Sequence, residues 1–212
     1  MMSSQTITRR FDGLFKSIAL SAGERGTDAQ AADMPWLPGC AKFLRHWDGL
    51  RHGAPMPATE DFIDNPSPEF APSVYILELL GESALVRLQG TALETRWHRR
   101  LTGQDFFAGR SDRFAASGTI NMRTLFAHPC GLLARTTYAT TRGRQITSDW
   151  IQVPLAVQSG RPPRIVGAVF QSDSDDQDYT ETPITYFKAH KVEWLDTGSG
   201  VPAVPPVEFQ PQ

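Results

Sequence analysis

The chain has 212 residues, of which 40% are hydrophobic and 21% are charged, a composition typical of a globular protein rather than a disordered or fibrous one. Its formal net charge of −2 gives no electrostatic reason to expect binding to nucleic acid or to an acidic membrane surface. No run of about 18 apolar residues occurs, so the sequence predicts no transmembrane helix. The length suits one or two compact domains.

Residues 1–38 are predicted to form an N-terminal extension. A short amphipathic helix is expected at Phe11–Ile18, where apolar residues recur with the spacing of one helix face. Small, polar and proline-punctuated residues from 19 to 38 predict a linker. Arg9 and Arg10 faintly resemble a twin-arginine export signal. Because Lys16 interrupts the apolar stretch that follows, we expect no signal peptide and a cytoplasmic location.

The main domain, predicted over 39–196, begins with a helix near Pro38–His52 that carries one apolar stripe. Prolines make the stretch 54–72 irregular, with one helical turn near Asp61–Ile63. Two strands joined by a tight hairpin follow at Val74–Leu80 and Ser83–Gln89. The chain is then helical or irregular as far as Leu101, and a longer helix is expected over Asp112–Ala127.

Three further strands are predicted over Leu132–Thr140, Gln145–Val157 and Arg164–Gln171. Hairpin-length connections make them neighbours in one antiparallel sheet. An acidic loop and a final apolar segment, Ile184–Leu195, come next, and 197–212 is expected to be a flexible, exposed, proline-rich tail. The predicted fold class is therefore α+β, with a five-stranded antiparallel sheet and helices on one face.

Several short phrases resemble a family of compact bacterial PAS proteins that carry a single sensory domain without a fused kinase or cyclase. They are Trp47-Asp48-Gly49-Leu50-Arg51, Met56-Pro57, Arg87-Leu88-Gln89-Gly90-Thr91-Ala92-Leu93, Leu101-Thr102-Gly103 and Val153-Pro154-Leu155. Their order and spacing extend the resemblance over about residues 39–171. The chain departs from the family at His98-Arg99-Arg100, where a glycine is expected, and at Asn65-Pro66, where an aspartate is expected.

Three of these residues also have a physical interpretation. Gly90 lies between a strand and a helix, where a residue without Cβ lets the chain turn sharply or pass close to a neighbour. Gly103 is expected to end the short helical stretch in a left-handed conformation. Pro154 cannot donate a ladder hydrogen bond, so it predicts an edge, a bulge or the end of a strand.

The sequence shows no catalytic or metal-binding pattern. The five histidines form no metal-type pair, and the two cysteines, Cys40 and Cys130, are expected to be separate thiols. No nucleophile elbow or phosphate-binding glycine loop occurs. We therefore expect no enzyme activity, no cofactor and no metal. A group of arginines is either a solvated face or a surface for an anionic ligand or partner; it comprises Arg96, Arg99, Arg100, Arg110, Arg113 and Arg123.

The resemblance to PAS proteins implies a ligand pocket between the sheet and the inserted helices. Pockets of this kind are mainly apolar with a few polar anchors. The apolar candidates are Phe106, Phe107, Phe114, Met122, Leu125, Phe126, Tyr138, Trp150 and Val166, and the candidate anchors are Tyr138, Asn121, Thr137 and Arg87. The alternative is that these side chains simply fill a close-packed core.

The leading hypothesis is a non-enzymatic sensory module that binds a small ligand, a protein partner or both, and that forms a homodimer through the apolar stripes of Pro38–His52 and Phe11–Ile18. The alternative is an enzyme or carrier with a cone-like α+β fold and an acid/base pocket. Asp149 with Tyr138 is the one pair available for it. Successive strand residues face opposite sides, so Asp149 is expected to face solvent if Trp150 faces the core.

Overall fold

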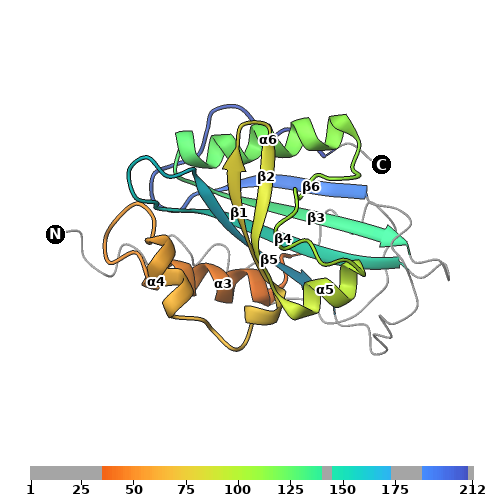
Figure 1. Ribbon diagram of the computed structural model, residues 1–212, viewed down its shortest axis with the longest axis horizontal. Coiled ribbons are helices and arrows are strands. Elements are labelled where there is room, and N and C mark those ends of the chain that lie inside the picture. The colour runs from red at the N-terminus through yellow and green to blue at the C-terminus, as the bar shows by residue number, and fades with distance from the viewer. Residues whose placement is uncertain (1–34, 140–144, 173–187, 210–212) are drawn as a thin grey trace.

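The computed structural model describes residues 35–139, 145–172 and 188–209. Its elements in chain order are α3 (Pro38–Gly49), α4 (Thr59–Asp64), a 3-10 turn (Ala71–Ser73), β1 (Val74–Leu80), β2 (Ser83–Gln89), α5 (Thr91–Trp97), α6 (Asp112–Ala127), β3 (Gly131–Ala139), β4 (Gln145–Leu155), β5 (Arg164–Gln171) and β6 (Lys188–Leu195), as Figure 1 shows. The predicted helix at Phe11–Ile18, its linker as far as residue 34 and the acidic loop lie outside the described residues. The predicted strands are confirmed with boundaries that differ by at most two residues.

The strands form one six-stranded antiparallel sheet with the order β2-β1-β5-β4-β3-β6. The sheet has one strand more than the five predicted, because β6 pairs with β3 and forms an edge of the sheet. Its residues Lys191–Trp194 alternate between charged and apolar, which is the period of a strand with one buried face. Within the described part of the predicted apolar segment, Lys188–Leu195 forms this last strand.

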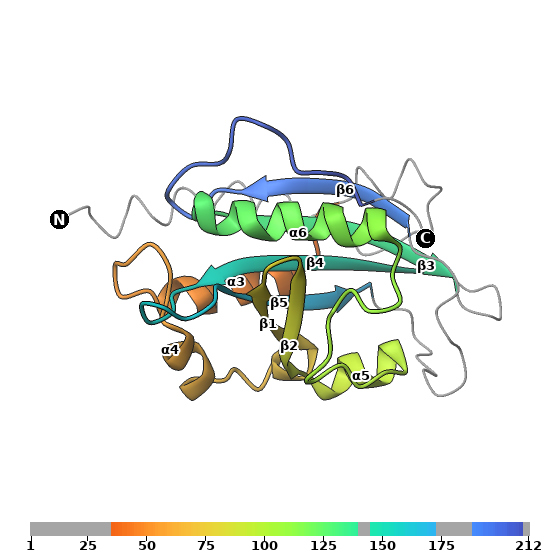
Figure 2. The same ribbon diagram turned by 45° about the horizontal axis from the view of Figure 1, so that its top comes forward.

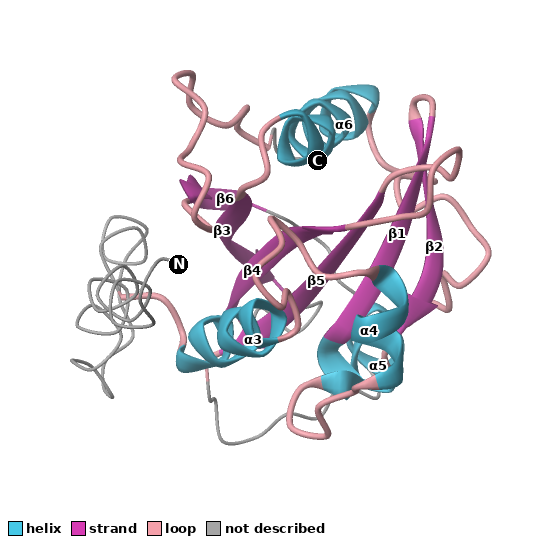
Figure 3. Cartoon of the chain, turned by 90° about the vertical axis from the view of Figure 1, so that its left-hand side faces the viewer, coloured by secondary structure: helices cyan, strands magenta, loops and turns pink. Residues whose placement is uncertain are grey.

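Helices cover both faces of the sheet, so the prediction of a single covered face is wrong for the leading helix. Phe43 and Trp47 of α3 share one hydrophobic cluster with Ile151 and Val153 of β4. The inserted helices α5 and α6 pack on the opposite face, in a second cluster, as predicted. Figure 3 shows α3 and α6 on opposite sides of the strands. The physical reason is that the central strands carry apolar side chains on both faces.

The edge of the sheet at β2 is covered by the chain that follows α5. The Gly103 amide donates to the Val86 carbonyl at 2.8 Å, and the Val86 amide donates to the Gln104 carbonyl at 2.9 Å. Gly103 has the predicted left-handed conformation, with φ of +82°. It does not end the helix, however, because α5 ends at Trp97 with His98 as its left-handed cap, at φ of +48°. Covering the edge in this way hides backbone groups that could pair with another chain.

The residues that carry the family resemblance hold separate elements together. The Trp47 indole N–H donates to the Pro154 carbonyl at 3.0 Å, which fixes α3 to the end of β4. Arg51 donates to the Thr197 carbonyl, and its guanidinium lies 5.3 Å from the centre of the Trp47 ring. A Cβ on Gly90 would lie 2.3 Å from the Pro72 carbonyl oxygen, so the backbones approach as closely as only glycine allows. Thr91 begins α5 directly after it.

Candidate ligand-binding site

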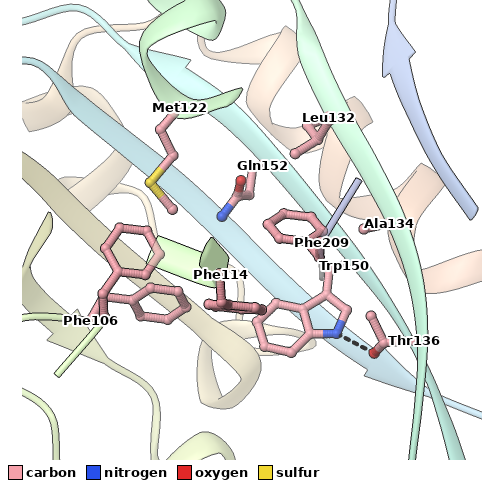
Figure 4. Close-up of a pocket in the computed structure, with 10 residues that line it drawn as sticks. Phe106, Phe114, Met122, Leu132, Ala134, Thr136, Trp150, Gln152 and Phe209 are labelled. Carbon is pink, nitrogen blue, oxygen red and sulfur yellow. Dashed lines mark hydrogen bonds between the residues drawn. The ribbon is translucent and has the colours of Figure 1, made fainter. Parts of the chain in front are cut away.

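A small cavity lies between α6 and the sheet, on the face opposite α3. Its volume is about 30 Å³, and its lining consists of Phe106, Phe107, Phe114, Met122, Leu132, Ala134, Thr136, Trp150, Gln152 and Phe209 (Figure 4). This is room for one or two water molecules. Pockets for organic ligands commonly measure about 300–1,000 Å³. In this conformation side chains fill most of the space, as the close-packed alternative expects.

Aromatic rings occupy that space. Tyr75 stacks on Phe106 with ring centroids 5.7 Å apart, and Trp97 stacks on Trp150 at the same separation. The Trp150 N–H donates to the Thr136 hydroxyl at 2.9 Å, which fixes its ring (Figure 4). Sequence reasoning missed Trp97, because the irregular stretch before Leu101 gave no clear helix whose faces could be assigned.

Gln152 is the one lining side chain that ends in an amide. It is 6% exposed, and in Figure 4 it lies among Met122, Leu132 and Phe209. Its Nε2 donates to the Tyr75 hydroxyl at 2.8 Å, whereas its Oε1 has no hydrogen-bond partner within the described part of the chain. Burial raises the pKa of Tyr75, so the phenol keeps its proton. A buried acceptor without a donor is destabilising, and it marks a place where a donor on a bound molecule would be stabilised.

The structure brings together five of the predicted pocket residues: Phe106, Phe107, Phe114, Met122 and Trp150. Leu125 is buried in the same cluster but does not line the cavity. Tyr138 lies further along β3, where its hydroxyl accepts a hydrogen bond from Gln171 at 2.5 Å. Thr137 faces Thr147 across the β3–β4 pair, with their hydroxyls 3.1 Å apart. Neither residue reaches the cavity as an anchor.

Arg87 cannot anchor a ligand in this cavity because its side chain belongs to the other face of the sheet. It binds the buried Glu78 carboxylate, which Arg164 also binds at 2.8 Å. The hydrogen bond from Arg87 lowers the pKa of Glu78, so the carboxylate stays charged. Val86 packs toward the cavity face, and adjacent strand residues alternate. Arg87 is therefore part of a structural ion-pair group.

Five of the six arginines in the predicted group have separate intramolecular partners, and the sixth, Arg113, is exposed. Arg96 donates to the Val169 carbonyl, Arg99 to the Ala108 carbonyl and Arg123 to Glu82. Arg100 pairs with Glu94, and the Arg110 guanidinium lies 5.8 Å from the centre of the Phe114 ring. These contacts support the solvated-face interpretation.

Asn121 binds the C-terminal segment, which the sequence predicted to be an exposed extension. Its Nδ2 donates to the Val207 carbonyl and its Oδ1 accepts from the Val207 amide, both at 2.8 Å. Phe209 reaches the cavity, with its ring centroid 5.4 Å from that of Phe114. Figure 2 shows the chain after β6 running back past α6. The prediction of a flexible, exposed tail is therefore wrong for residues 204–209, because polar and aromatic contacts bind this segment to α6.

On the opposite face, Asp149 forms a buried ion pair with Arg135. Two bonds of 2.6 Å join the guanidinium to both carboxylate oxygens, and the two side chains are 2% and 0% exposed. Asp149 also accepts from the Leu37 amide at 2.7 Å, and Arg135 donates to the Pro35 carbonyl at 2.7 Å. The guanidinium lies 4.9 Å from the centre of the Trp36 ring. The pair ties the residues before α3 to the sheet.

The prediction that Asp149 faces solvent is therefore wrong. Trp150 and Asp149 do point to opposite faces, but the chain before α3 covers the second face as well. A carboxylate that is held by Arg135 and separated by the sheet from Tyr138 cannot share a proton with it. The pair on which the enzyme alternative depended is not formed.

Both cysteines are free and buried, as expected of separate thiols. Cys40 packs in the α3 cluster and Cys130 in the cluster on the other face. Burial raises the pKa of the Cys130 thiol to about 11. Across the described residues, no three histidine, cysteine or acidic side chains gather where they could hold a metal ion, and no helix is long and apolar enough to span a membrane.

An antiparallel sheet whose inserted helices cover an aromatic-lined cavity defines an α+β domain with a small internal site. A family model described as a PAS domain matches residues 37–170. The chain belongs to the PAS domain family, whose fold is that of a sensory and signalling module. The match ends before β6 and the C-terminal segment, and the predicted domain limits of 39–196 stay a prediction.

The chain is also similar to solved structures, among them "Structure of RsLOV D109G". The identity is 10% and the TM-score 0.36, and the likeness covers 52% of this chain and 65% of that one, less than two thirds of its length. A search of the curated proteins finds no match.

Proposed function

We propose that this PAS protein is a non-enzymatic sensory module that binds a small, mainly apolar ligand carrying one hydrogen-bond donor in the cavity between α6 and the sheet. The main support is that Gln152 Oε1 is a buried hydrogen-bond acceptor without a donor among the described residues. Desolvating such an oxygen costs about 1–3 kcal/mol, which a ligand N–H or O–H would offset. The rest of the lining offers contact to rings and alkyl groups.

Binding requires the cavity to enlarge, because 30 Å³ is far below the volume of an organic molecule. The side chains best placed to move are those outside the sheet. Phe106 and Phe107 lie between α5 and α6, and Phe209 lies in the C-terminal segment. Met122 has an unbranched side chain that adapts to different shapes. Ligand entry would thus first shift loop and tail residues, and this displacement is a conformational signal.

The test uses two probes of similar shape, indole and 1-benzothiophene, of which only indole has an N–H. Binding to the full chain is measured by ligand-observed NMR. We expect Gln152→Leu to weaken indole at least tenfold, about 1.4 kcal/mol, and to leave 1-benzothiophene within twofold. Tyr75→Phe is the matched control, because it removes the same Gln152–Tyr75 hydrogen bond but keeps Oε1. Equal affinity of indole for the wild type and Gln152→Leu would overturn the assigned role of Gln152.

We also propose a protein partner and a homodimer, since PAS domains commonly mediate both kinds of association. The stripe of α3 cannot supply the dimer contact that the sequence suggested, because Phe43, Leu44 and Trp47 are buried against the sheet of the same chain. The remaining candidate, Phe11–Ile18, lies outside the described residues. Light scattering of the full chain and of a Phe11→Asp variant tests this point: the variant should be monomeric, and an unchanged mass would contradict the proposed contact.

A further inference from the structure

We infer that the surface of α6 around Asn121 is a peptide-binding site whose resident ligand is the chain's own segment Val204–Phe209, and that this segment competes with a small ligand for the cavity. The peptide site stands on the contacts of the tail alone. The competition rests on the proposed function.

The first support is the way in which Asn121 binds the backbone. Its amide group takes both the N–H and the C=O of Val207, at 2.8 Å each, which is how one strand residue pairs with another across a sheet. Asn121 is 1% exposed beneath this contact. Without the tail, a donor and an acceptor in the middle of α6 would both lose their partners. The side chain is therefore suited to an extended peptide of either internal or external origin.

The second support is an aromatic anchor two residues further along. Phe209 lines the cavity together with Trp150 and Gln152, and its ring packs on Phe114. One backbone contact and one ring thus define the recognised pattern, an extended peptide with an aromatic residue two positions after the residue bound by Asn121.

The third support is that the segment is attached by few contacts. Val204 and Val207 are 67% and 38% exposed, and the segment joins no strand ladder. One further anchor is the Trp194 N–H, which donates to the Val204 carbonyl at 2.8 Å. Segments with few buried contacts open at low free-energy cost. A ligand that needs the volume of the Phe209 ring can therefore displace it without unfolding the domain.

The experiment uses full-length chains and a fluorescent synthetic peptide of residues 204–212. Phe209→Ala vacates the anchor in the chain, so we expect the wild-type peptide to bind this variant at least tenfold more tightly than it binds the wild-type chain, measured by anisotropy. A peptide carrying Phe209→Ala should bind at least tenfold more weakly. Adding Asn121→Leu to the chain should weaken the wild-type peptide to the same degree. Glu208→Ala, a change at an exposed neighbour, is the matched control and should behave as the wild-type chain does.

Hydrogen exchange gives a second measurement that needs no added peptide. The Val207 amide should exchange at least tenfold faster in Asn121→Leu and in Phe209→Ala than in Glu208→Ala. Unchanged exchange, or equal binding of the two peptides, would overturn the peptide site.

The competition is tested with indole, which should bind Phe209→Ala at least fivefold more tightly than wild type. Equal indole affinity would overturn the competition while leaving the peptide site standing. Failure of indole to bind any chain, with peptide binding intact, would count against the proposed ligand site and the competition, but not against the peptide site.

Discussion

The buried ion pair between Arg135 and Asp149 gives the sharpest test of how the chain before α3 is held. Asp149→Asn keeps the shape of the side chain but removes its charge, so the Arg135 guanidinium stays buried without a counter-ion. Removing one member of a buried pair costs about 3–5 kcal/mol, whereas whole domains are stable by about 5–15 kcal/mol. The asparagine can still accept one bond from Arg135 or from the Leu37 amide, but not all three that the carboxylate accepts. We therefore expect Asp149→Asn to lower the free energy of unfolding by about 4 kcal/mol.

Urea denaturation with linear extrapolation measures the free energy of unfolding. The double variant Arg135→Met/Asp149→Leu removes both charges together, and it should be more stable than Asp149→Asn alone because no buried charge is left unpaired. Glu69→Gln is the control, since the Lys42–Glu69 pair is 49% and 55% exposed and should contribute less than about 1 kcal/mol. The prediction is wrong if Asp149→Asn lowers the free energy of unfolding no more than Glu69→Gln does. It is also wrong if the loss in the double variant equals the added losses of Arg135→Met and Asp149→Leu measured separately.

Three further predictions concern the packing of the domain and the dependence of its stability on pH. Gly90→Ala should destabilise by about 1–3 kcal/mol in urea, because the new Cβ would meet the Pro72 carbonyl at 2.3 Å. Gly49→Ala, with open space around its Cβ, should instead stabilise by about 0.5–1 kcal/mol, and a loss at both positions would contradict the close approach. Trp47→Phe keeps an aromatic ring but leaves the Pro154 carbonyl of β4 without its donor, so calorimetry should show a loss of stability of about 1–3 kcal/mol. An unchanged melting temperature would show that this hydrogen bond does not stabilise the domain. Burial raises the pKa of the Cys130 thiol from 9.0 to about 11, so the folded state holds this proton more tightly than the unfolded state does. The free energy of unfolding should therefore fall as the pH rises from 9 to about 11. Cys130→Ala should show a smaller fall over the same pH range.

The positions of β1 to β5 along the chain could be predicted from the sequence, because period-two alternation and tight turns are local signals. It could not show that both faces of the sheet are covered, since that depends on which long-range partner each apolar residue meets. Asp149 illustrates the difference. Strand alternation correctly places Asp149 and Trp150 on opposite faces of the sheet. Solvent exposure of Asp149 does not follow from alternation, because it depends on what covers its face. The Arg135 partner lies directly opposite it across the β3–β4 register, which a sequence-based pairing of the two strands could have found.

The cavity shows the same limit on the scale of single side chains. Phe106, Phe114 and Trp150 were predicted to meet because they lie on elements that the family resemblance places together. Phe209 was missed because nothing in a proline-rich tail indicates where it docks. The signal that existed was Asn121, a polar residue within the apolar pattern of α6. Such a residue needs a partner when it is buried, and the partner was the tail.

Strand β4 connects the two sites that these results define. Asp149 holds the chain before α3 on one face, whereas Trp150 and Gln152 line the cavity on the other. Adjacent residues of one strand cannot shift independently, because each is fixed by the ladder bonds to β3 and β5. Under the proposed function, a ligand that displaces this stretch would act on the residues before α3 through the β4 backbone. The Trp47–Pro154 bond adds a second tie between the same strand and α3. The cavity lining and the contacts to α3 thus come from the same strand, so under the proposed function a change in cavity occupancy would reach the opposite face through β4.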